Sequence, residues 1–151
     1  MGLRALSKSW LPVVGWAALI SILSTDAFSS EHTSRFFLPL LHWIFRGASE
    51  NTLEILHAII RKSAHLTEYF LLGLLLYRAL RGREQGWQLK WAIWAAAIAA
   101  GYGALDEFHQ VFVPSRTASP WDALLDTVGA CAAQVAMWRV WKRRAVVNRD
   151  S

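Results

Sequence analysis

The 151-residue sequence has one cysteine, Cys131, and fewer acidic than basic residues. A single cysteine excludes an intramolecular disulfide, so thiol pairing indicates no redox compartment. Cys131 stands among alanines, where we expect it to be packed inertly. The chain holds 16 Lys and Arg against 11 Asp and Glu, a formal net charge of +5. In a chain with long apolar segments, this balance favours anionic lipid over nucleic acid as a partner, and we expect no nucleic acid.

The sequence also lacks the short motifs that mark many enzymes. It contains no His-Glu-x-x-His motif, no nucleophile elbow, no internal repeat and no low-complexity segment. The first two motifs would place a metal ion or an activated serine on a defined helix or turn. We therefore expect no metal and no other cofactor, and a binding role is favoured over an enzymatic one. The length indicates a single domain over residues 1–151.

Apolar residues are abundant instead, at 54% of the chain, and nine of the residues are tryptophans. This composition is typical of a small membrane protein. A helix needs about 20 mainly apolar residues to cross about 30 Å of hydrocarbon. Four segments approach that length, at about residues 10–28, 64–80, 87–105 and 121–141. The sequence therefore predicts an all-α fold, an integral membrane bundle of four transmembrane helices.

The first segment is the weakest, because polar residues 24–26 follow its last apolar residue, Leu23. A cleaved signal peptide is an alternative, with Arg4 and Lys8 as its basic start, although the small-x-small cleavage pattern is poor. Either way the chain emerges on the same side. With the N-terminus inside, most basic residues lie on the cytoplasmic side and most acidic residues lie outside. This distribution predicts a multi-pass protein with both termini in the cytoplasm.

The stretch between the first two segments, about residues 35–60, is expected to be helical without spanning. "RFFLPLLHWIFR" is too short to cross, so it predicts an interfacial or re-entrant helix that Pro39 either bends or starts. "NTLEILHAII" repeats its apolar residues at helical spacing and should lead directly into the second segment. The histidines of this region, His32, His42 and His57, are expected at the surface.

Ionisable residues gather where the second, third and fourth segments meet on the outer side. In the second segment Lys62, His65 and Tyr69 share one helical face, and Glu68 lies beside it. An Asp, Lys or Arg at the centre of a membrane helix costs about 2.5 to 3.5 kcal/mol. A cluster of such residues therefore predicts a functional site.

The third segment contributes Asp106 and Gln110, which extend a row of small residues formed by Ala99 and Gly103. Glu107 flanks this row. Small residues let helices approach closely, so the polar stripes of neighbouring segments are expected to face one another.

The fourth segment carries Asp122, Asp126, Gly129 and Ala133 on one face. Asp122 has an alternative structural explanation, because it stands three residues after Ser119 and matches a capping box. Asp126 is one turn deeper and cannot cap the helix, which makes it the stronger candidate for function.

Two stretches carry a family resemblance. "KSAHLTEYFLLGLLLYRAL" followed by "DEFHQVFVPSRTASPWDALLDTVGA" resembles the VanZ-like family of bacterial membrane proteins. The shared features are the basic-x-x-His-x-x-x-Tyr face, Asp-Glu-x-x-Gln, the Pro-x-Arg loop and the Asp that follows. Arg61 departs from the pattern, because an acid is expected there in many members. The resemblance implies a role at the bacterial cell envelope, in the cytoplasmic membrane, in a family named for resistance to the glycopeptide teicoplanin.

The predicted binding residues are Lys62, His65, Glu68, Tyr69, Asp106, Glu107, Gln110, Arg116, Asp122 and Asp126. Arg116 either pairs with a neighbouring acid or holds a phosphate or carboxylate. The favoured hypothesis is a protein that binds or moves an amphiphile or a lipid-linked envelope precursor. One alternative is a membrane enzyme with Glu107 or Asp106 as base and His65 as its partner. Another is a non-catalytic structural or partner subunit.

Overall fold

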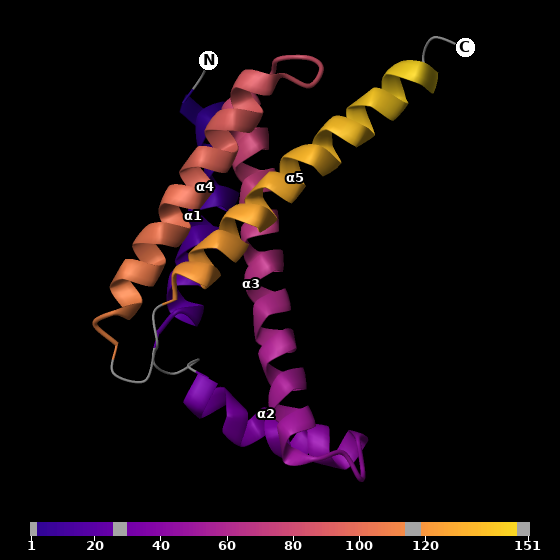
Figure 1. The fold of residues 1–151 in the computed structure, drawn as a ribbon. Helices are drawn as coiled ribbons and strands as arrows, with labels where there is room; N and C mark the ends of the chain where they lie inside the picture. The colour runs from indigo at the N-terminus through magenta and orange to yellow at the C-terminus, as the bar shows by residue number, and fades with distance from the viewer. Residues whose placement is uncertain (1–2, 26–29, 114–118, 148–151) are drawn as a thin grey trace.

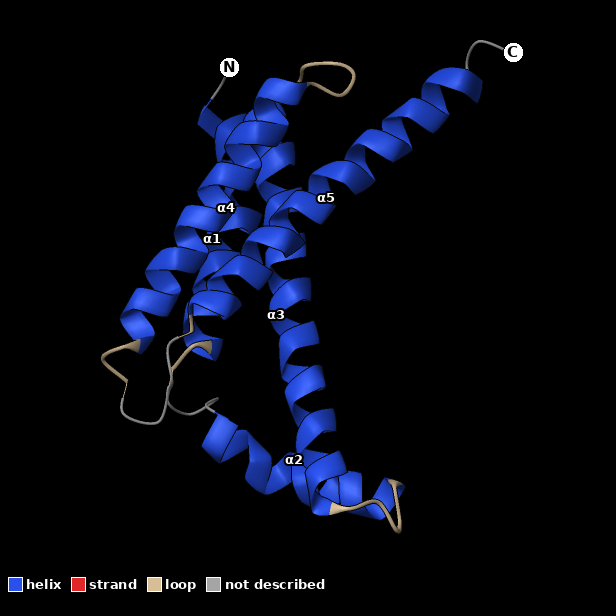
Figure 2. Ribbon diagram, viewed as in Figure 1, coloured by secondary structure: helices blue, strands red, loops and turns tan. Residues whose placement is uncertain are grey.

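The computed structural model describes residues 3–25, 30–113 and 119–147. Those residues form helices and no strands (Figure 2). The helices are α1 (Leu3–Leu23), α2 (Ser30–Ile44), α3 (Glu50–Arg81), α4 (Leu89–Gln110) and α5 (Pro120–Val147). The predicted all-α class is therefore confirmed for the described part of the chain.

The helices form a bundle with α2 at one end (Figure 1). α1, α3 and α4 run side by side, while α5 crosses α3 and its C-terminal half projects away from the bundle. Among the described residues, no helix combines the length and the apolar character that crossing a bilayer requires. The four crossings thus remain a prediction.

α3 is one continuous helix of 32 residues, as expected for a stretch in which residues 51–60 lead into the second segment. Its start is capped by Ser49, whose hydroxyl accepts a hydrogen bond from the Thr52 N–H at 3.3 Å. It ends at Gly82, where φ is +58° and the N–H donates to the Arg78 carbonyl at 3.2 Å. In α2, Pro39 lies inside the helix rather than at its start.

Small residues bring α3 and α5 into close contact. A Cβ added at Gly129 would lie 2.6 Å from the Leu66 carbonyl oxygen, and one at Gly73 would lie 3.1 Å from the Ala130 oxygen. Ala133, one turn further along α5, is fully buried. The predicted close approach through small residues is therefore confirmed. Cys131, in the same helix, is exposed, so the expectation that it is packed was wrong.

α1 is attached to this core by long-range hydrogen bonds. The Trp16 indole N–H donates to the Glu68 carbonyl at 2.9 Å, and the Tyr102 hydroxyl donates to the Ala17 carbonyl at 2.7 Å. These contacts place the end of α1 next to α3 and α4. Ser24, which follows Leu23, is thereby brought to Asp106 of α4.

Candidate functional site

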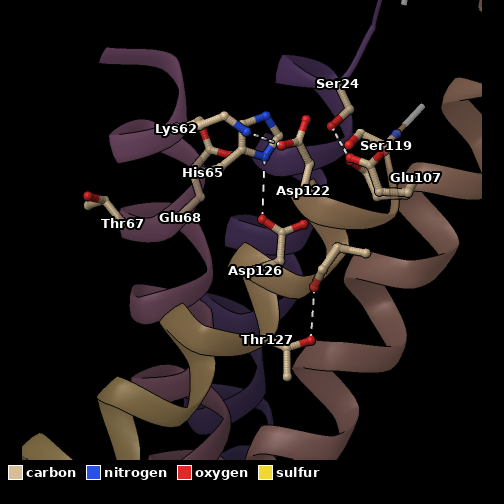
Figure 3. Close-up of polar contacts among 12 residues, drawn as sticks. Ser24, Lys62, His65, Thr67, Glu68, Glu107, Ser119, Asp122, Asp126 and Thr127 are labelled. Carbon is tan, nitrogen blue, oxygen red and sulfur yellow. Dashed lines mark hydrogen bonds and ion pairs between the residues drawn. The ribbon is translucent and has the colours of Figure 1, made fainter. Parts of the chain in front are cut away.

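Two pairs of charged residues join α3 to α5 near the end of the bundle where α2 lies (Figures 1 and 3). Lys62 Nζ lies 2.7 Å from Asp122 Oδ1, and His65 Nδ1 lies 3.4 Å from Asp126 Oδ1. The second pair is one helical turn beyond the first on both helices. The predicted polar faces of the second and fourth segments therefore meet.

The two pairs differ in burial. The Lys62 and Asp122 side chains are 56% and 20% exposed, whereas His65 is 14% exposed and Asp126 is completely buried. A solvent-exposed ion pair contributes only about 0–1 kcal/mol, while a buried carboxylate must regain its lost hydration from its partners. The deeper pair is the costly one, and it requires a functional or structural reason.

The surroundings of Asp126 supply few partners. Among the described residues, neither of its oxygens has a hydrogen bond of good geometry, and the buried Tyr69 hydroxyl nearby also has no partner. Gly103 makes room for this arrangement, because a Cβ there would lie 3.1 Å from Asp126 Oδ2 and 3.2 Å from the Tyr69 ring. Buried polar atoms without partners are uncommon in folded proteins and often mark a site of function.

The two acids of α4 are held by other groups. Asp106 Oδ2 accepts hydrogen bonds from Ser24 Oγ at 2.6 Å and from Gln110 Nε2 at 3.0 Å. Glu107 Oε2 accepts one from the Ser119 N–H at 2.9 Å. Asp106 and Gln110 therefore turn toward α1, and Glu107 turns toward the start of α5.

These contacts bear on two expectations from the sequence. We expected the α4 acids to face His65; the carboxylate in contact with His65 is that of Asp126, whereas Asp106 and Glu107 bond to Ser24 and Ser119. We also considered a capping box between Ser119 and Asp122. Instead the Ser119 N–H is bound by Glu107, and Asp122 pairs with Lys62. Arg116, the remaining predicted member, lies outside the described residues.

A pocket of about 220 Å³ opens beside this cluster, between the end of α1, α2 and α3. We call it the α2–α3 pocket. It is lined by Leu23, Ser24, Thr33, Phe37, His57, Ile60, Arg61, Ala64, His65 and Glu68. The lining thus combines polar or charged side chains with apolar ones. His65 belongs to both features, because it lines the pocket and contacts Asp126.

Two members of this site were not predicted from the sequence. His57, expected at the surface, is 7% exposed and packs against the Phe37 ring at 5.8 Å between centroids. Burial lowers the pKa of His57, and the nearby Arg61 lowers it further. The missed signal is the spacing of residues 57, 61, 65 and 68, which repeats every three to four residues and puts them on one face of α3.

Ser24 is the second missed member. It is 3% exposed and donates the shorter of the two hydrogen bonds to Asp106. In the sequence it is only the first polar residue after the apolar segment that ends at Leu23. No local pattern links residues 24 and 106, so only the packing of α1 against α4 reveals the contact.

Comparison with known proteins gives one match. A model of the family described as VanZ/LLP1 matches residues 9–142. No curated protein and no solved structure matches the chain significantly. The matched region contains both α3–α5 pairs and the whole α2–α3 pocket.

Proposed function

Since the chain belongs to the VanZ-like family, we propose that it binds the head group of an amphiphile or lipid-linked envelope precursor in the α2–α3 pocket. Family membership supports a resistance-related role at the level of the family. The ligand, the pocket as its site, and a location in the bacterial cytoplasmic membrane with both termini inside are our proposal.

The observation that carries the proposal is the mixed lining of the α2–α3 pocket. Arg61, His57 and His65 of α3 line it together with the apolar Ile60 of α3 and Phe37 of α2. A phosphate or carboxylate suits Arg61, because a guanidinium binds such groups with two parallel hydrogen bonds. The start of an alkyl or polyprenyl chain suits the apolar residues.

The size of the pocket limits what it can hold. Sites for drug-sized ligands occupy about 300–1,000 Å³, whereas this pocket is about 220 Å³. It therefore fits a head group and not a whole lipid. The chains of the ligand would lie outside, along apolar side chains of α2 such as Phe36 and Trp43, which are 80% and 67% exposed.

Exposed apolar surface supports a membrane location. Large apolar side chains are exposed on all five helices, for example Leu11 on α1, Ile59 on α3, Trp94 on α4 and Val128 on α5. Soluble monomers rarely expose contiguous apolar patches larger than a few hundred Å². A lipid or detergent environment would cover these side chains.

The direct test compares a polyprenyl phosphate with the polyprenol of the same chain length. Binding to the full chain in non-ionic micelles is measured by titration calorimetry. We expect the phosphate to bind more tightly, and Arg61→Gln to weaken it by about tenfold through loss of a charge-assisted hydrogen bond. The matched control is Arg46→Gln, because Arg46 is exposed between α2 and α3 and does not line the pocket.

Two outcomes would contradict the proposal. One is equal binding of the phosphate and the alcohol, and the other is an equal loss in both variants. The resistance role is tested separately, by growth of a susceptible bacterial host in teicoplanin with and without the protein. We expect wild type and Arg46→Gln to protect the host and Arg61→Gln to protect it less.

A second candidate function, acid–base catalysis on the bound precursor, is favoured by the pair of His65 and Asp126. A buried carboxylate next to a histidine fixes the ring and stabilises its protonated form, which suits a general base. The test is turnover of a radiolabelled lipid-linked precursor by the purified protein. A product that disappears in His65→Gln, while binding persists, would favour the enzyme, and stoichiometric binding without product would exclude it.

A further inference from the structure

The opposite end of the bundle, away from α2, contains two adjoining hollows. An apolar groove of about 340 Å³ lies between α4 and α5, with Ala92, Ile93 and Ala96 on one side and Cys131, Val135 and Trp138 on the other. It lies where α5 diverges from α4 toward its C-terminal end (Figure 1). It is separate from the α2–α3 pocket and shares none of its lining residues.

α5 brings both small and large residues to this region. Gly129, Ala130 and Ala133 allow close contact with α3, and the larger Val135 and Trp138 line the groove. Gln134 also lines the groove and is 7% exposed. Its amide nitrogen donates to the Gly73 carbonyl at 3.1 Å, while its buried oxygen has no hydrogen-bond partner among the described residues.

The second hollow is basic. Trp138, Arg139, Lys142, Arg143 and Val147 line a depression of about 610 Å³ near the end of α5. Lys142 Nζ lies 5.3 Å from the centre of the Trp138 ring. Within the described part of the chain, none of these three cations forms an ion pair with an acid. Trp138 lines both hollows, so the apolar groove and the basic depression adjoin at this side chain.

We infer that the groove and the basic depression together form a binding site for an anionic lipid. An acyl chain occupies the groove, and the phosphate of the head group contacts Arg139, Lys142 and Arg143. Charge complementarity favours this occupant, because basic residues beside an anionic lipid surface each contribute appreciably to binding. A second copy of this chain fits less well, because its own basic end would bring like charges together.

Cys131 provides a direct measure of occupancy. It is the single cysteine of the chain, it is exposed, and it lines the groove. An acyl chain in the groove covers its thiol. The experiment therefore follows the rate of maleimide labelling of the full-length protein in non-ionic micelles. Phosphatidylglycerol is added in one series and phosphatidylcholine with the same acyl chains in the other.

We expect phosphatidylglycerol to slow labelling at lower concentrations than phosphatidylcholine. The triple variant Arg139→Gln/Lys142→Gln/Arg143→Gln should raise the phosphatidylglycerol concentration for half-protection by roughly 10- to 100-fold. The matched control, Lys8→Gln/Arg78→Gln/Arg83→Gln, removes the same charge from exposed residues at the same end of the bundle. It should leave half-protection unchanged.

The groove itself is tested by Ala96→Trp, which fills it. This variant should abolish protection of Cys131 by either lipid, relative to its own rate without lipid. Equal protection by the two lipids in the wild type would overturn the inference, as would an equal loss in the two triple variants. These outcomes are independent of the α2–α3 pocket, because none of the substituted residues lines it.

Discussion

The two ends of the bundle carry charged side chains in opposite ways. At the end near α2, Asp106, Glu107 and Asp126 are each no more than 7% exposed and are contacted by groups from other segments of the chain. At the other end, Arg139 and Lys142 are exposed, and Lys142 packs against a tryptophan ring. Both ends are rich in charge, but only the first removes it from solvent.

A substitution at the end near α2 should therefore affect stability, whereas one at the opposite end should affect only binding. A buried carboxylate lowers stability unless its partners compensate for its lost hydration. Stability at the first end therefore depends on how these partners are placed. Exposed cations keep their hydration, so anion binding at the second end depends on the number of cations there. Substitutions at the two ends, and at the helix crossing between them, distinguish these two kinds of dependence.

The largest effect is expected at Gly129, where α3 and α5 touch between the two ends. Gly129→Val places side-chain atoms against the Leu66 backbone and should reduce the free energy of unfolding by about 3 kcal/mol. Gly101→Ala is the control, because Gly101 has open space around its Cβ position and should gain up to about 1 kcal/mol in helix propensity. Denaturant unfolding followed by circular dichroism measures both. Equal effects would mean that the crossing is not tightly packed.

The next comparison is between the buried and the exposed ion pair. Asp126→Asn should cost about 2 kcal/mol of unfolding free energy, because it leaves His65 without its buried partner. Asp122→Asn should cost less than about 1 kcal/mol, because Lys62 stays solvated. Unfolding of both variants under the same conditions gives the difference.

The same variants separate a functional site from a merely structural one. If Asp126 only locks the register of α3 and α5, precursor binding in Asp126→Asn should fall no more than its stability explains. If it supports the α2–α3 pocket through His65, binding falls even at temperatures where the variant is fully folded.

A smaller effect is expected at Ser24, which connects α1 to α4. Ser24→Ala removes the hydroxyl that donates to Asp106 and should cost about 1 kcal/mol. Thr67→Ala is a suitable control, because the Thr67 hydroxyl is exposed and bonds only to the Ser63 carbonyl of its own helix. Comparable losses in both variants would show that burial of the Ser24 contact adds nothing.

The smallest effect concerns pH. Burial and Arg61 lower the pKa of His57 from its ordinary value of 6.5. Below pH 6.5 His57 binds a proton in the unfolded chain but not yet in the folded protein. The free energy of unfolding therefore decreases as the pH is lowered, until His57 is also protonated in the folded protein. His57→Gln should remove this part of the dependence, as measured by unfolding between pH 7.5 and pH 5. A steeper loss in the variant would contradict the assignment.

Much of the architecture was predictable because it depends on local pattern. Apolar periodicity placed the helices, and the spacing of Lys62 and His65 against that of Asp122 and Asp126 placed two polar faces opposite each other. The pattern was less reliable for residues with two possible partners. Asp106 bonds to Ser24, and Glu107 bonds to the Ser119 backbone, because the packing of the helices places these groups within hydrogen-bond distance of the two acids.

The sequence by itself determined the helical class, the family and the set of ionisable residues at one end of the bundle. Those properties follow from spacing and residue type, which are local. The partners of these residues, the burial of His57, the exposure of Cys131, the α2–α3 pocket and the groove between α4 and α5 arise only from the tertiary structure. These depend on how closely helices cross, and the crossing is set by a few glycines and alanines whose neighbours are distant in the chain.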